Sequence, residues 1–218
     1  MQVLAVLAQK GGVGKSMVAR SLAVQALIAG RKSAIIDADP QGTVVSWSRR
    51  REAPAPAVLA VGSRSIRDVL AEVGDRGAEF VLIDTPPHAQ PIISMAAKEA
   101  TATLIVTGPY PEDLEQVGVV AAIVQGLGKP SGILLNKTPG RAHAVALARG
   151  ALATFRYPVC PTAITQLVAH PYASAEGLTA QEREPGSKAA IEIQHAWDWI
   201  LRAILVSKDA KILMKRRA

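Results

Sequence analysis

The chain has 218 residues, of which 49% are hydrophobic, and its formal net charge is +7 at pH 7. This length fits one domain with a substantial apolar core. The single cysteine, Cys160, excludes an intramolecular disulfide, a Cys-x-x-Cys pair and a cysteine-ligated iron–sulfur cluster, and it indicates a reducing, cytoplasmic setting. The apolar start of the chain lacks the basic leader of a signal peptide. No apolar stretch reaches the roughly 20 residues that span a bilayer.

Short apolar runs alternate with longer runs of helical character along most of the chain. The predicted strands are mostly apolar, as in strands buried on both faces: Val3–Ala8, Ser33–Ile36, Phe80–Ile83, Thr103–Thr107 and Gly132–Leu135. The helices predicted between and after them are Ser16–Ala29, Ser65–Val73, Pro91–Ala100, Pro111–Gly126 and Arg141–Thr154. This alternation predicts an α/β fold, with a predominantly parallel twisted sheet and helices on both faces in three α/β/α layers.

The last third of the chain is less regular. A late strand is expected near Tyr157–Cys160, and a last helix from an N-cap at Ser187 to about Val206. Arg51–Pro56 and Thr179–Gly186 are rich in polar residues and proline and are predicted to be surface loops. We therefore expect one domain over residues 1–206.

The turn between the first predicted strand and helix reads Lys10-Gly11-Gly12-Val13-Gly14-Lys15-Ser16. A glycine-rich turn at this place directs successive backbone N–H groups at an anion, and the helix start adds its positive end. In the general pattern of a P-loop NTPase the lysine reaches the outer phosphates and the hydroxyl binds Mg²⁺, roles that fall to Lys15 and Ser16. Gln9 replaces the first glycine of that pattern, and Lys10 is an additional cation. The predicted nucleotide contacts here are Lys10, Gly11, Gly12, Val13, Gly14, Lys15, Ser16 and Met17.

Three acidic residues lie at the carboxyl ends of two predicted strands, where ligands of open α/β sheets gather. Asp84 has the position of a Walker B acid, which holds Mg²⁺ directly or through water. Ser16, Asp37 and Asp84 form the predicted metal set. Asp39, farther out in Asp37-Ala38-Asp39-Pro40-Gln41-Gly42, is predicted to orient the attacking water. Turn formation is the alternative for both Asp37 and Asp39, and the pattern leaves open which of them orients water.

Together these segments resemble the ParA/MinD family of deviant Walker A ATPases. The Asp-x-Asp-Pro-Gln-Gly form resembles the ParA branch, in its short type without an N-terminal helix-turn-helix domain. The resemblance covers the chain from Met1 to about Val206 and implies a homodimer that closes around ATP. It also implies weak ATP hydrolysis, with Lys10, Lys15 and Asp39 as catalytic residues, and Lys10 crossing to the partner's phosphates. A cation supplied in trans can accelerate phosphoryl transfer by about 10³–10⁵.

The choice of base is less visible in the sequence. In the resemblance, Asn136 lies where an asparagine contacts the base. Asn136-Lys137 also occurs in GTP-binding proteins, but Pro139 replaces the acid that completes the guanine motif. The sequence therefore favours ATP, with Mg²⁺. Pro161 and Thr162 are expected to line the base from the other side, with a plain loop as the alternative.

The positive balance favours a polyanionic partner, because basic surfaces gain affinity by displacing counterions from phosphates. The resemblance implies nonspecific DNA binding by the ATP dimer, hydrolysis stimulated by a ParB-like protein, and a nucleoid-associated role in positioning a plasmid, chromosome or other cargo. Residues 207–218 form a basic tail, either flexible or part of the domain. The predicted DNA contacts are Arg183, Lys188, Arg202, Lys208, Lys211, Lys215, Arg216 and Arg217.

Two other functions remain open. In the first, the tail lies on an anionic membrane surface as in the MinD branch, through Ile212, Leu213 and Met214 beside its basic residues. That apolar face is short and has no Phe or Trp, so a membrane is less favoured than DNA. The second is a metabolic P-loop enzyme, which needs an acceptor-substrate pocket for which no motif is evident. The sequence identifies neither the cargo nor the partner.

Overall fold

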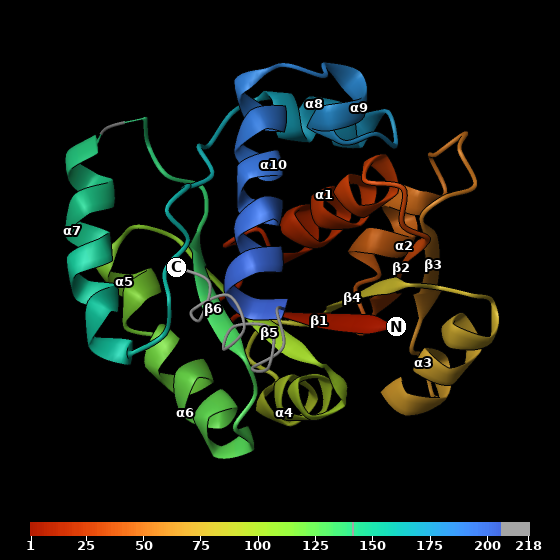
Figure 1. Ribbon diagram of the computed structural model, residues 1–218, viewed down its shortest axis with the longest axis horizontal. Coiled ribbons are helices and arrows are strands. Elements are labelled where there is room, and N and C mark those ends of the chain that lie inside the picture. The colour runs from red at the N-terminus through yellow and green to blue at the C-terminus, as the bar shows by residue number, and fades with distance from the viewer. Residues whose placement is uncertain (141, 206–218) are drawn as a thin grey trace, which may run out of the picture.

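A computed structural model describes residues 1–140 and 142–205 of the chain (Figure 1). Six strands form one sheet in the order β3–β2–β4–β1–β5–β6, and every neighbouring pair is parallel. Parallel neighbours require crossover connections, so the carboxyl ends of the strands meet at one edge of the sheet. The strands are β1 Gln2–Leu7, β2 Ser33–Asp37, β3 Ala57–Ala60, β4 Phe80–Asp84, β5 Ala102–Thr107 and β6 Ser131–Leu135.

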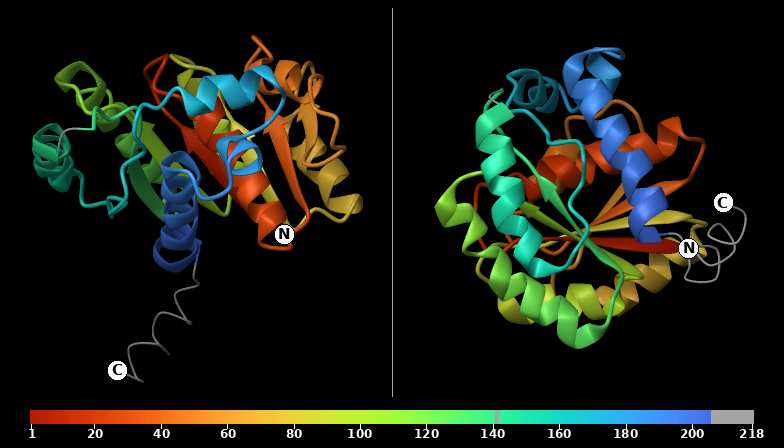
Figure 2. Two further views of the ribbon diagram at one scale, coloured as in Figure 1. Left: turned by 90° about the horizontal axis from the view of Figure 1, so that it is seen from above. Right: turned by 60° about the vertical axis from the view of Figure 1, so that its left-hand side comes forward.

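Helices cover both faces of the sheet, which gives the predicted three layers (Figures 1 and 2). Alternate residues of β1 enter two separate cores: Leu4 and Val6 pack in one, and Val3, Ala5 and Leu7 in the other. The first core includes α1 (Lys15–Ile28) and α10 (Lys188–Ile200). The second includes α3 (Ile66–Asp75), α4 (Gln90–Glu99), α6 (Val117–Leu127) and α7 (Ala142–Leu152).

The other helical elements are short: α2 Thr43–Ser48, α5 Pro111–Leu114, α8 Ala169–Ala175 and α9 Ala180–Arg183, with a 3₁₀ turn at Ala153–Phe155 and a π-helical turn at Leu201–Leu205. The predicted N-cap is confirmed, because the Ser187 hydroxyl accepts a hydrogen bond from the Ala190 N–H at 3.3 Å. In the described part of the chain, none of the helices is long and apolar enough to cross a membrane. The predicted tail, 207–218, and the predicted helix end at Val206 lie outside the described residues.

In the first 130 residues, the structure differs from the predicted elements at several places. The edge strand β3, Ala57–Ala60, was not predicted, because it is short and only half-buried and so has no long apolar run. The helix predicted over Pro111–Gly126 is divided into α5 and α6. The Thr107 hydroxyl donates to the Asp113 carbonyl at 3.1 Å. In a continuous helix, this carbonyl would accept from the backbone N–H four residues later.

Two predictions in the last third were wrong. Tyr157–Cys160 is not a strand and makes one bridge to β6, between Ile133 and Val159, because Pro158 and Pro161 lack the N–H groups that a ladder needs. Thr179–Gly186 is not only a loop, because it contains α9. A capping box starts this helix: the Glu182 carboxylate accepts from the Thr179 N–H at 2.8 Å, and Thr179 caps the helix in return.

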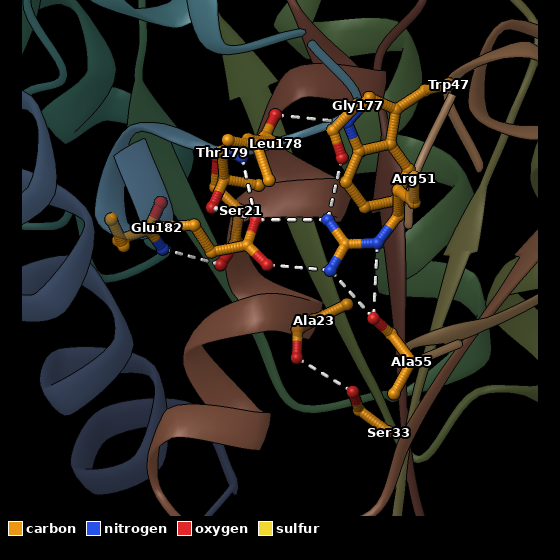
Figure 3. Close-up of polar contacts among 11 residues, drawn as sticks. Ser21, Ala23, Ser33, Trp47, Arg51, Ala55, Gly177, Leu178, Thr179 and Glu182 are labelled. Carbon is orange, nitrogen blue, oxygen red and sulfur yellow. Dashed lines mark hydrogen bonds and ion pairs between the residues drawn. The ribbon is translucent and has the colours of Figure 1, made fainter. Parts of the chain in front are cut away.

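Arg51 ties the chain after α2 to the segment that leads into α9 (Figure 3). Its side chain is 2% exposed and donates to both Glu182 oxygens, at 2.6 and 3.0 Å, and to the Gly177 carbonyl at 2.8 Å. Its guanidinium lies 4.6 Å from the centre of the Trp47 ring, and the Trp47 indole donates to the Leu178 carbonyl at 3.0 Å. The segment predicted as a surface loop at Arg51–Pro56 therefore begins with a buried, fully engaged residue.

Candidate nucleotide-binding site

The phosphate loop joins β1 to α1 at the carboxyl edge of the sheet. Gly12 and Gly14 both have positive φ, at 79° and 91°, a conformation that favours glycine. Gly14 is needed for a second reason, because a Cβ at this position collides with the side-chain amide of Asn136. The Asn136 Nδ2 donates to the Val13 carbonyl at 2.7 Å, and its Oδ1 is buried without a partner among the described residues. Asn136, at the end of β6, therefore braces the loop.

Lys15 places a buried cation at the start of α1. The residue is 6% exposed, and its ammonium makes a long hydrogen bond of 3.4 Å to the Lys10 carbonyl. Burial lowers the pKa of Lys15, against the opposing effect of the Asp84 and Asp39 carboxylates. A bound phosphate group would supply the opposite charge that the protein alone provides only in part.

Asp84 ends β4 with a carboxylate that has no hydrogen-bond partner on either oxygen among the described residues. The residue is 0% exposed, and burial raises its pKa to about 7. The Ser16 hydroxyl and the Lys15 ammonium lie close enough to lower the pKa of Asp84. The Ser16 hydroxyl nevertheless makes no hydrogen bond of ordinary geometry with the Asp84 carboxylate. A buried, unpartnered carboxylate beside a hydroxyl fits the oxygen ligands that Mg²⁺ prefers. Ser16 and Asp84 are therefore the residues that could hold the ion, and this role stays a prediction.

Asp37 and Asp39 have different surroundings. Asp37 is 2% exposed and accepts from three backbone N–H groups, those of Asp39 at 3.1 Å, Val44 at 3.0 Å and Val45 at 3.1 Å. It therefore holds the turn into α2, and a role as a metal ligand stays a prediction. Asp39 is partly exposed, accepts from the Gln41 N–H at 2.9 Å, and faces the cavity described next. Of the two acids, Asp39 is the one that lines the cavity.

A cavity of about 940 Å³ lies over the loop and the first turns of α1. One part of its wall follows β6 at Asn136, Lys137 and Pro139, and another is the segment 165–168. Backbone hydrogen bonds between Thr138 and residues 164 and 166 place these two segments side by side. The loop residues and the start of α1 that line the cavity are Gly11, Gly12, Gly14, Lys15, Ser16 and Met17.

Two predicted base contacts do not line this cavity. Pro161 lies on a separate shallow hollow, where its carbonyl accepts from Arg149 at 2.7 Å, and Thr162 lines neither hollow. The chain reaches the cavity only after Ile164, where it pairs with Thr138. Residues 165–168, which no sequence motif marked, line the cavity where Pro161 and Thr162 were expected to line it.

Lys10 and Val13 lie behind the loop, away from the large cavity, where they line a small hollow. The Lys10 ammonium forms an ion pair with Asp113 of α5 at 2.6 Å, and this hydrogen bond raises the pKa of Lys10. The Lys10 side chain is 39% exposed, so its ammonium can be reached from outside. Within one subunit, Lys10 is paired with a carboxylate rather than directed at the phosphate site.

A family model described as the CobQ/CobB/MinD/ParA nucleotide-binding domain matches residues 4–180. The chain belongs to this family. The match includes the loop and all three acids, so the predicted family and the predicted P-loop fold are confirmed. Membership also supports the predicted ATP hydrolysis and the predicted cofactors ATP and Mg²⁺.

Several known proteins are similar to most of the chain. The maintenance of carboxysome distribution protein A of Gloeobacter kilaueensis is 35% identical over 185 residues, which cover 82% of this chain and 83% of that protein. The cell division ATPase MinD of Pyrococcus furiosus has a TM-score of 0.74 at 20% identity, covering 92% of this chain and 98% of that one. The Cyanothece McdA–ATP complex has a TM-score of 0.69 at 16% identity, covering 95% and 98%.

The predicted DNA contacts are not brought together among the described residues. Arg183 of α9 is paired with Glu176 at 3.1 Å, and Lys188 donates to the Thr165 hydroxyl at 3.0 Å. Arg202 is exposed but lies beyond the other end of α10, roughly 20 Å from Lys188 at 1.5 Å per residue (Figure 1). The remaining members, Lys208, Lys211, Lys215, Arg216 and Arg217, lie outside the described residues.

Proposed function

We propose that this chain is a ParA-type ATPase that uses ATP and Mg²⁺ to position or segregate a cargo. The observation that carries the proposal is the buried, unpartnered Asp84 carboxylate beside Ser16 and Lys15 at the mouth of a P-loop. The relative from Gloeobacter kilaueensis is named for the distribution of carboxysomes, which supports a positioning role over a metabolic one. The cargo is a plasmid, a chromosome or a protein compartment.

Each polar group of the site has a defined task in this proposal. Lys15 and the N–H groups of the loop bind the phosphates, and Ser16 and Asp84 hold Mg²⁺, which neutralises developing charge when bound. Asp39 orients the attacking water with the oxygen that does not accept from Gln41. Asp37 keeps the turn into α2 in place, which fixes Asp39 over the cavity.

Hydrolysis requires two subunits in this proposal. Lys10 leaves Asp113 and reaches the triphosphate of the partner subunit, so that neither subunit alone is a complete enzyme. Dimerisation also doubles the positive surface, so DNA affinity depends on the nucleotide and falls steeply with salt. A ParB-like protein stimulates hydrolysis and releases the dimer from DNA, which places the ATP form on the nucleoid.

The test is ATP turnover of the full chain with and without Mg²⁺ and duplex DNA, together with a DNA shift assay in ATP, ADP or no nucleotide. We expect turnover that needs Mg²⁺, a shift that needs ATP, and the loss of both in the Lys10→Ala variant. Lys32→Ala is the matched control, because Lys32 is an exposed lysine far from the loop. Equal DNA binding in all nucleotide states rules out the switch, and binding to anionic vesicles in its place favours the membrane alternative.

A further inference from the structure

The cavity extends past the phosphate loop to a second polar wall that none of the roles above uses. This wall joins α1, the end of α2 and α8, and its polar side chains are Arg20, Arg50, His170 and Ser174. Arg20 follows Ser16 by four residues on α1, so the two side chains lie on one face of the helix about one turn apart. The second wall is therefore directly beside the position of a bound nucleotide.

Arg20 is a buried cation without a carboxylate partner among the described residues. It is 9% exposed, donates to the neutral Ser174 hydroxyl at 2.8 Å, and lies 5.5 Å from the centre of the Trp47 ring. Burial lowers the pKa of Arg20 to about 10, against the opposing effect of the Asp84 carboxylate, which forms no ion pair with Arg20, and the nearby Arg50 also lowers it. A guanidinium presents five N–H donors, and a buried cation is stable only when its charge is compensated. The environment of Arg20 therefore calls for an anion.

His170 gives a second, independent indication of a ligand at the same place. It is 8% exposed and lines the cavity, yet neither ring nitrogen has a partner among the described residues. Burial lowers its pKa, so at neutral pH the ring presents one donor and one acceptor. The Arg50 guanidinium, held by the Ser174 carbonyl at 3.3 Å, adds a charge at the exposed end.

The charge of the whole cavity lining points the same way. Its cationic side chains are Lys15, Arg20, Arg50 and Lys137, and the carboxylate among its lining residues is that of Asp39. Lys15 and Lys137 belong to the loop and base walls. Arg20 and Arg50 lie outside the two segments to which the phosphates and the base are assigned.

We propose that Arg20, Arg50, His170 and Ser174, together called the Arg20 subsite, bind a small phosphate anion while a nucleotide occupies the loop. A guanidinium matches a phosphate in geometry and charge. The deep position of Arg20 admits an isolated ion more readily than the backbone of a duplex. ATP hydrolysis in this cavity releases such an anion, so the source of the ligand rests on the proposed function, whereas the subsite itself does not.

The test separates the existence of the Arg20 subsite from ATP hydrolysis as the source of its ligand, because the phosphate is added to the solution. The full chain is saturated with Mg²⁺ and a nonhydrolysable ATP analogue, and radiolabelled inorganic phosphate is titrated in equilibrium dialysis at constant ionic strength. We expect saturable binding of one phosphate per chain. Because a charged hydrogen bond is lost, Arg20→Gln weakens binding about tenfold or more. Arg50→Gln, at an exposed position, weakens it less and does not threaten folding.

Arg31→Gln is the matched control. Arg31 also lies over an aromatic ring, 5.1 Å from the centre of Phe80, and also donates to a neutral side chain, Gln2, at 2.8 Å, but it does not line the cavity. Its loss leaves phosphate affinity unchanged if the subsite is real. Absence of binding to the unmodified chain, equal weakening by Arg31→Gln, or displacement of the phosphate by a short DNA duplex each overturns the proposal.

Discussion

The loop wall of the cavity and the junction between α2 and α9 are stabilised in opposite ways. At the loop wall the protein leaves polar groups without full compensation, such as the buried ammonium of Lys15 and the nearby carboxylate of Asp84. The α2–α9 junction, which does not line the cavity, is held by satisfied contacts between distant segments, among them Arg51 with Glu182 and Trp47 with Leu178. The comparison teaches that the loop wall is built for a ligand and the junction for stability. Substitutions in the two regions therefore have opposite consequences.

The largest effect is expected at Arg51. Arg51→Ala removes one partner of a buried ion pair, which leaves Glu182 uncompensated, and the free energy of unfolding falls by about 3–5 kcal/mol. Urea denaturation measures the change. Arg67→Ala is the control, because the Arg67 side chain is 72% exposed and its pair with Glu99 is screened by solvent, so its loss changes the free energy of unfolding far less. Equal losses in the two variants contradict a structural role for the α2–α9 junction.

Lys15→Gln has the reverse pattern. We expect ATP turnover to fall by about 10²–10³, as when one preorganised donor to the transition state is removed. The melting temperature of the nucleotide-free chain stays the same or rises, because a cation whose pKa burial has lowered is no longer held in the loop. Turnover assays and a thermal melt without nucleotide check both parts. A variant that loses activity together with its stability shows that Lys15 supports the fold.

Asp84 makes the stability of the nucleotide-free chain depend on pH. The pKa of Asp84 is about 7 in the folded chain and ordinarily 3.8 for an aspartate in water, so between these pH values the folded state holds a proton that the unfolded state has lost. Stability from this group is complete below pH 4. It is lost as the pH rises to 7, by about 1.4 kcal/mol per pH unit at most. Urea denaturation at pH 5 and pH 7.5 measures the loss, and Asp84→Asn is expected to abolish it.

The smallest change in stability is expected at Asp113. Asp113→Asn breaks a partly exposed ion pair that solvent screens, so the free energy of unfolding changes little. If Lys10 acts across a dimer, its release lowers the protein concentration at which the ATP analogue induces dimers. Sedimentation velocity measures that concentration. Glu115→Gln, at an exposed acid just beyond α5, is the control, and dimerisation that is identical in both variants contradicts the role of Asp113 as a competitor for Lys10.

The loop wall was predictable because its determinants are local. Gly12, Gly14, Lys15 and Ser16 lie in one short motif, and parallel strand order alone brings Asp84 to the same edge as the loop. The fold class followed from the apolar strands for the same reason. The edge strand β3 escaped prediction because a half-buried strand has no continuous apolar run.

Neither the α2–α9 junction nor the Arg20 subsite was predictable, because their determinants are contacts between residues more than a hundred positions apart. Arg51 and Glu182, or Arg20 and Ser174, carry no spacing that links them in the sequence. One local signal was available, since Thr179 and Glu182 have the spacing of a capping box. The ion pair of Lys10 with Asp113 was likewise not predictable, because Asp113 lies in α5, which the structure separates from the longer helix that the sequence predicts.

The bond between Asn136 and the Val13 carbonyl couples the strand that carries the base wall to the turn that grips the phosphates. Because Gly14 leaves no room for a Cβ there, the amide and the glycine form a matched pair. Evolution at either position is therefore constrained by the other. A substitution at position 136 that changes the preference for a nucleobase must therefore keep the hydrogen bond to Val13. Otherwise it lowers the affinity for every nucleotide.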